Sequence, residues 1–335
     1  MTTATQVPPP PSARPVASGQ RPTGAAPVRL IRSELLKFFT TNAWWIFAIL
    51  IFVSTSLVLV INLLIANERL IQADRMRSDG PPRFEPDPNA PPEQQIPPEQ
   101  IEEMQRQWER DSNRSLVLTD TAADVFTSGQ FLVLLFLVII GALLVTNEFH
   151  HQTATATFLT TPHRTAVILA KLAAAIILGI GIWVVVTAID IGVGATFYSL
   201  KWHEVVITDW SIVRSVLMNL LAFVVWVVLG VGFGVLIRNQ LGATITGGAL
   251  YLISYPVAFT FFGLIYTFII KEDWVWNGIV ALPGVASNIM VQPERVEIMP
   301  GVFAPTWWAA ALVLVGYAVV AGVLGTLITR KRDIS

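Results

Sequence analysis

The sequence predicts an all-α integral membrane protein with six transmembrane helices. Its 335 residues are 53% hydrophobic and only 13% charged, whereas charged residues usually make up about 25% of a soluble domain. Six apolar runs are each long enough for a helix that crosses a hydrocarbon core about 30 Å thick, and such a helix satisfies its own backbone in lipid. The runs cover residues 43–66, 122–145, 166–189, 213–236, 241–270 and 303–329.

Two segments precede the first run. Residues 1–27 are rich in Pro, Ala, Thr and Ser and predict a disordered cytosolic tail, because they cannot bury a core. After them, Val28, Ile31, Leu35 and Phe38 recur at helical spacing, with basic residues between them. This spacing predicts an amphipathic helix on the inner face of the membrane. A straight extension of the first span is the alternative.

Two long connections interrupt the apolar pattern. Residues 67–121 begin with a proline-rich stretch and end in a charged segment that starts at Pro98 and predicts a solvated helix. This outer insertion is either a spacer or a contact surface for an outside partner. Residues 271–302 are apolar but interrupted by Pro283 and Gly284, and neither half is long enough to cross the membrane. They predict an outer re-entrant hairpin before the last span.

Lys and Arg in the short loops predict the orientation of the chain. With both termini inside, the inner segments hold 11 basic and 3 acidic residues, a net charge of +8. Because the whole chain carries −1, the remainder carries −9. The sequence therefore predicts a multi-pass protein of the plasma membrane with both termini in the cytoplasm, including a short cytosolic end at residues 331–335. Nothing in this charge distribution indicates binding to nucleic acid.

Several kinds of chemistry are excluded by residues that the sequence lacks. It has no cysteine, and its four histidines all lie in loops, which excludes cysteine nucleophiles and histidine-based intramembrane proteolysis. No Gly is followed directly by Lys, so a GxxxxGK[ST] phosphate loop is absent. Asp190 is the one acid that qualifies as intramembrane, and its place late in its run predicts a position near the outer surface. We therefore expect a non-catalytic protein with no cofactor-binding or metal-binding residue of its own.

The loop between the second and third runs carries the most informative motif. It reads NEFHHQTATATFLTTPHRT, residues 147–165, in which small polar and apolar residues alternate before a proline. This pattern predicts a short helix parallel to the membrane that ends at Pro162. By itself, such a loop is only a connector.

In the order of these parts, the chain resembles the permease subunits of ABC-2 type transporters over residues 28–330, with residues 67–121 as an addition. The stretch IRSELLKFFTTNAWW before the first span, the six spans and the interrupted segment GIVALPGVASNIM before the last span follow the family's order. In the loop, His150 and Gln152 replace the family's usual Arg and Gly. The residues that match the family's loop pattern are Glu148, Phe149, Thr153, Leu159, Pro162 and Arg164.

The resemblance implies that this loop is a coupling helix, which docks on a cytosolic ABC ATPase subunit through those six residues. ATP and magnesium would then bind to the ATPase subunit and not to this chain. The chain would act in membrane lipid as a dimer with a second copy or a sibling permease, and would export an amphipathic or hydrophobic substrate. The sequence names no substrate-binding residue. A membrane sensor or immunity protein of the same fold and a secondary carrier are the alternatives.

Overall fold

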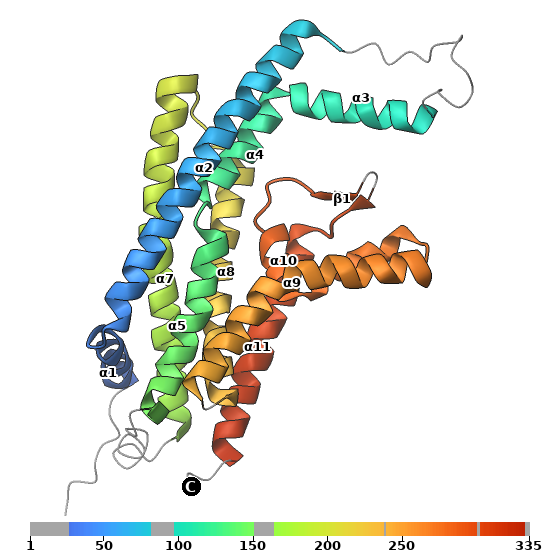
Figure 1. Ribbon diagram of the computed structural model, residues 1–335. Helices are drawn as coiled ribbons and strands as arrows, with labels where there is room; N and C mark the ends of the chain where they lie inside the picture. Colours follow the sequence, from blue (N-terminus) through green and yellow to red (C-terminus); the bar gives the residue numbers. More distant parts are fainter. Residues whose placement is uncertain (1–26, 82–96, 151–163, 238, 300–301, 332–335) are drawn as a thin grey trace, which may run out of the picture.

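The protein, seen in a computed structural model, is a predominantly helical multi-pass membrane protein (Figure 1). The structure describes residues 27–81, 97–150, 164–237, 239–299 and 302–331. Within these residues, six helical stretches are long and apolar enough to cross a membrane, which confirms the six predicted spans. They are Ala43–Asp79, Arg114–Glu148, Thr165–Trp202, Trp210–Leu236, Gln240–Phe268 and Trp307–Gly325. The predicted tail before residue 27 lies outside the described residues.

The described chain begins with helix α1 (Pro27–Phe39), followed by helix α2 (Ala43–Asp79). A turn separates the two helices, so α1 is not a straight continuation of α2. Thr41 stabilises this turn, because its backbone N–H and its hydroxyl both donate to the Phe38 carbonyl, at 3.2 and 2.7 Å.

Helix α2 is longer than the first apolar run, which ends at residue 66. Ala66, Leu70 and Ala73 are spaced at helical intervals and are at most 1% exposed. This buried face packs against neighbouring helices at the far end of the bundle, which supports the helix as far as Asp79 although the sequence there is charged. The first part of the predicted outer insertion is therefore a continuation of α2.

The rest of the insertion that the structure describes folds into helices α3 (Pro98–Ser112) and α4 (Arg114–Phe126). The predicted helix at Pro98 is confirmed. Helix α4 begins after Asn113, whose side-chain oxygen accepts hydrogen bonds from the backbone N–H groups of Ser115 and Leu116 at 3.2 and 3.4 Å. Figure 1 shows α3 projecting sideways at one end of the bundle, while α4 continues into it.

Helices α5 (Gln130–His150) and α8 (Trp210–Leu236) form the centre of the bundle. Gly141 of α5 and Gly230 of α8 lie against each other, and a Cβ atom on either glycine would collide with the backbone of the partner helix. Their small size therefore allows the two backbones to approach closely. The core around this contact includes Trp226, which is completely buried.

The remaining membrane helices flank this central pair. Helix α7 (Arg164–Phe197), which ends in the short π-helix η2 (Tyr198–Trp202), lies with α2 on one side (Figure 1). Helices α9 (Gln240–Phe268) and α11 (Trp307–Lys331) lie on the other side. The faces that these helices turn outward carry many exposed Leu, Ile, Val and Phe side chains, as contact with lipid requires.

Helix α9 contains Pro256, and Figure 1 shows that its second half bends away from the bundle. The segment after α9 is short and compact. Trp276 and Ala286 in this segment are only 2% and 0% exposed, so it packs against protein. Its elements are the 3-10 helix η3 (Asp273–Ala281), helix α10 (Pro283–Ile289) and the antiparallel strands β1 (Glu297–Met299) and β2 (Val302–Phe303).

Candidate functional site

Four charged side chains meet at the end of the bundle where α1 lies, which we call the α1 end. Glu34 and Lys37 come from α1, Glu148 from the last turn of α5, and Lys171 from the second turn of α7. Lys37 Nζ lies 2.6 Å from Glu34 Oε1 and 2.5 Å from Glu148 Oε1. Lys171 Nζ lies 2.5 Å from Glu34 Oε2 and 3.0 Å from Glu148 Oε1. Each lysine therefore bridges both glutamates, and we call these four residues the anchor network.

Three members of the anchor network are almost completely buried. Glu34, Lys171 and Glu148 are 4%, 5% and 7% exposed, whereas the Lys37 side chain is 43% exposed. Lys171 Nζ also donates a hydrogen bond of 3.1 Å to the Leu144 carbonyl. Removing an ion from water costs several kcal/mol unless a partner compensates for it. The two lysines and two glutamates compensate each other, and the network as a whole has no net charge.

Lys37 is held as a cation at neutral pH. Partial burial lowers the pKa of its ammonium group, but the hydrogen bonds with Glu148 and Glu34 outweigh this effect and raise the pKa above its ordinary value of 10.5. Lys37 therefore stays paired with both carboxylates. The network ties α1 to the end of α5 and the beginning of α7, which are distant from it in sequence.

The structure places one of the six predicted coupling residues with its side chain. Glu148 belongs to the anchor network, so its carboxylate points into the protein and contacts α1 and α7. Phe149 and Arg164 are helical, at the last turn of α5 and the first residue of α7. Thr153, Leu159 and Pro162, and with them the predicted helix between α5 and α7, lie outside the described residues.

Sequence reasoning missed the other three members of the anchor network. Of these three, only Lys171 could have been recognised from the sequence. It is a cation inside an otherwise apolar run, where a charge is costly unless it is paired. Glu34 and Lys37 have the i, i+3 spacing of an exposed helical pair. Their inward orientation depends on how α1 packs against α7, which the sequence does not reveal.

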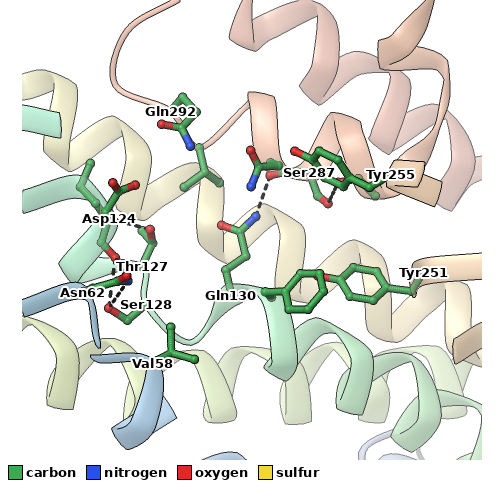
Figure 2. A pocket seen from close by; sticks show the side chains of 15 residues that line it. Val58, Asn62, Asp124, Thr127, Ser128, Gln130, Tyr251, Tyr255, Ser287 and Gln292 are labelled. Atoms are coloured by element: carbon green, nitrogen blue, oxygen red, sulfur yellow. Dashed lines mark hydrogen bonds between the residues drawn. The ribbon is translucent and has the colours of Figure 1, made fainter. Parts of the chain in front are cut away.

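The second candidate site is a cavity of about 180 Å³ with polar and apolar walls beside residues 127–129, where α4 ends and α5 has not yet begun. Figure 2 shows side chains from α2, α4, α5, α9 and α10 converging on it. We call it the break cavity. Its 15 lining residues are Val58, Asn62, Ala123, Asp124, Thr127, Ser128, Gln130, Phe131, Tyr251, Tyr255, Gly284, Ser287, Asn288, Val291 and Gln292.

Side chains add hydrogen bonds to backbone carbonyls at the helix break. Asn62 Nδ2 donates to the Asp124 carbonyl and to the Ser128 hydroxyl, each at 3.0 Å. The Ser128 hydroxyl in turn lies 2.7 Å from the Val125 carbonyl, to which it donates. Irregular backbone within a membrane protein requires such partners, because lipid offers none. These bonds join α2 to the end of α4.

Gln130, the first residue of α5, connects the break to the opposite wall of the cavity. Its Nε2 donates to the Ser287 carbonyl of α10 at 2.8 Å, and its Oε1 accepts from Asn219 Nδ2 of α8 at 3.0 Å. Figure 2 shows Gln130 between the break and the two tyrosines of α9. The amide is therefore fixed at both ends, and the walls of the cavity are preorganised.

Asp190 is buried between helices of the bundle. It is 1% exposed, because α7 continues past the predicted end of its run and packs against α4 and α8. The carboxylate faces the backbone N–H of Gly129 but makes no hydrogen bond of ordinary geometry to a described residue. The Thr55 hydroxyl also lacks a partner among the described residues. The predicted position near the outer end of its span concerns depth in the membrane and stays a prediction.

Comparison with known proteins places the chain in one family. A family model described as "protein of unknown function (DUF2705)" matches residues 108–335. The chain belongs to this family. The match includes Glu148, Lys171 and most of the break cavity, but it begins after α1, so Glu34 and Lys37 lie outside it. No curated protein matches the chain. Among the described residues, no group of three His, Asp or Glu side chains is placed to hold a metal ion.

Proposed function

We propose that the chain is the permease subunit of an ATP-driven exporter of the ABC-2 type, with both termini in the cytoplasm of a cell membrane. In this proposal, a separate ATPase subunit binds ATP and magnesium, and a second copy or a sibling permease completes the membrane pathway. The six apolar helices and the charge difference of +8 inside against −9 outside support it. The α1 end is then the cytoplasmic end.

The elements at both ends of the bundle fit this assignment. α1 is a separate helix at the cytoplasmic end, where an amphipathic helix can lie along the inner leaflet. At the opposite end, η3 and α10 measure about 18 and 10 Å, from rises of about 2.0 and 1.5 Å per residue. Neither can cross a core of about 30 Å. Their burial against protein supports an outer re-entrant hairpin.

The anchor network is the observation that carries the proposal. It binds α1 to the two helix ends that flank residues 151–163, the segment expected to dock on the ATPase. A loop that only connects two helices does not need its flanking helix ends to be held together by buried ion pairs. Because the anchor network joins these helices through buried, mutually paired charges, a displacement of this segment by an ATPase would move α1, α5 and α7 together. Glu148 acts here as a positioning residue, and direct docking is left to Phe149, Thr153, Leu159, Pro162 and Arg164.

The test uses the chain co-expressed with a candidate ABC ATPase subunit from the same organism. Leu159→Asp should release the ATPase subunit from the detergent-purified complex and abolish efflux, since losing a contact of about 1–3 kcal/mol weakens docking about 5-fold to over 100-fold. The matched control is Leu200→Asp in η2, at the opposite end, where Leu200 is already 74% exposed. Equal ATPase retention by both variants, or ATP hydrolysis by this chain without a second polypeptide, would contradict the proposal.

The buried carboxylate of Asp190 favours an ion-coupled carrier as the second candidate function. An unpaired acid inside a membrane protein is costly, and in transporters such residues commonly bind the coupling ion. Asp190→Asn keeps the shape and removes the ionisable group. If this variant abolishes transport while Leu159→Asp transports normally, the carrier is supported and the ATP-driven exporter is rejected.

A further inference from the structure

The break cavity combines one negative charge with a wall of neutral polar and aromatic groups. Among its 15 lining residues, Asp124 is the only charged one. Amides, hydroxyls and the rings of Phe131, Tyr251 and Tyr255 form most of the remainder. At about 180 Å³ the cavity is smaller than a pocket for a drug-sized molecule, which usually measures about 300–1,000 Å³. It therefore fits a headgroup or a small organic molecule.

The charge of Asp124 is only weakly compensated within the protein. Among the described residues, its nearest cation is Arg69 of α2, with Nη1 4.0 Å from Asp124 Oδ2, the outer limit for an ion pair. Both side chains are well exposed, at 55% for Arg69 and 43% for Asp124. Pairs of this kind contribute little and exchange readily. A cation that enters the cavity can therefore pair with Asp124 without breaking a strong internal bond.

The aromatic side of the cavity is suited to the apolar part of the same ligand. Tyr251 is 5% exposed, and its ring lies 5.6 Å from the ring of Phe131. The ring of Tyr255 stacks on Phe259 at 6.2 Å, which holds it in place. Figure 2 shows Asp124 on one side of the cavity and the two tyrosines on the other, with Gln130 between them. Fixed aromatic rings bind apolar groups and attract cations.

We propose that the break cavity binds an organic ammonium ion, with its charged nitrogen at Asp124 and its apolar body against Tyr251 and Tyr255. Anionic ligands are disfavoured by the carboxylate, and a purely apolar ligand would cover the carboxylate without supplying a partner for its charge. The assignment of this ligand as the transported substrate rests on the proposed function. The ammonium group can belong to a free organic cation or to the headgroup of an amine lipid, and the chemistry recognised is the same.

The experiment measures equilibrium binding of radiolabelled benzyltrimethylammonium to the full chain, purified in an uncharged maltoside detergent. The unchanged protein should bind the probe saturably, and Asp124→Asn should weaken binding by at least about 10-fold, because loss of a charge pair within a partly enclosed site removes about 1.4 kcal/mol or more. Tyr255→Leu should weaken it about 3-fold to 10-fold. Glu272→Gln, which removes an exposed carboxylate outside the cavity, should leave binding within about 2-fold.

Two competitors sharpen the result. Benzyl alcohol, which keeps the ring and lacks the charge, should not displace the probe at equal concentration. Added phosphatidylethanolamine should displace it if the headgroup of a lipid is the natural source, and should leave it bound if a free cation is. Both of these lipid outcomes support the ammonium site. Unchanged binding by folded Asp124→Asn, or equal displacement by benzyl alcohol, would overturn it.

This binding assay needs no ATPase subunit. Loss of ATPase coupling in the Leu159→Asp experiment therefore tests the exporter, while probe binding to the purified chain tests the cavity. If the probe binds and no ATPase associates, the ammonium site is supported and the ATP-driven exporter is rejected. If the ATPase couples and the probe does not bind, the exporter is supported and the ammonium site is rejected.

Discussion

The two candidate sites differ in how closely their charged groups are paired and how deeply these groups are buried. In the anchor network, buried ions are paired at 2.5–3.0 Å, and Glu34, Glu148 and Lys171 are at most 7% exposed. In the break cavity, the single carboxylate has a cation only at 4.0 Å, and both partners are well exposed. The first arrangement fixes helices in place, and the second leaves a charge available to a ligand.

This difference indicates that the anchor network is structural, whereas the break cavity is suited to binding a ligand. A buried ion pair is rarely a source of net stability, but breaking one is very costly, so it holds one geometry and resists others. In the break cavity, hydrogen bonds between uncharged side chains keep the walls in place, while the exposed carboxylate can exchange one cationic partner for another. The contrast predicts that substitutions in the anchor network affect folding, whereas substitutions of the cavity's charge affect binding and leave folding intact.

The largest effect is expected for Lys171→Met. It leaves Glu34 and Glu148 buried with only the half-exposed Lys37 as a partner, and breaking a buried pair in this way costs about 3–5 kcal/mol. Little folded protein should survive detergent extraction, measured by size-exclusion chromatography and thermal unfolding. The control is Lys271→Met, an exposed lysine outside both sites, which should stay within about 0.5 kcal/mol. Equal stability of the two variants would contradict the view that the anchor network stabilises the fold.

An intermediate effect is expected for Ser128→Ala at the helix break. The substitution removes the hydroxyl that donates to the Val125 carbonyl and accepts from Asn62, and the loss of two hydrogen bonds of about 0.5–1.5 kcal/mol each costs about 1–3 kcal/mol. The matched control is Ser78→Ala near the end of α2, where the hydroxyl is exposed. Thermal unfolding should show a clear loss for the first variant only. If both behave like the unchanged protein, the side chains at the break do not support its backbone.

The smallest effect on stability is expected for Lys37→Met. Its side chain is 43% exposed, so solvent screens the pairs and their loss costs about 1 kcal/mol, which corresponds to about 5-fold faster hydrogen exchange in α1. The effect depends on pH. Because the folded-state pKa lies above 10.5, the contribution of Lys37 is complete below pH 10.5 and is lost as the pH rises past the folded-state value. Exchange in α1 of the variant should lack this alkaline step, and a step of unchanged size would contradict the role of Lys37.

Sequence patterns alone predicted the six spans and the start of α3. Uninterrupted apolar runs predicted the six spans, and Pro98 predicted the start of α3, because both signals are local and act through lipid solvation or backbone geometry. The end of α2 was not predictable in this way. Its charged last turns are helical because Leu70 and Ala73 pack in the folded bundle.

The sites depended more strongly on tertiary structure. The sequence by itself determined that this chain has six segments apolar enough to span a membrane, and that it contains neither a phosphate loop nor a cysteine. Only the fold decided that Lys171 of α7 meets Glu34 of α1 across 137 positions, and that Asp124 borders a cavity closed by α9 and α10. Hydropathy acts on each segment separately, whereas a buried ion pair or a cavity exists only when distant segments have packed together.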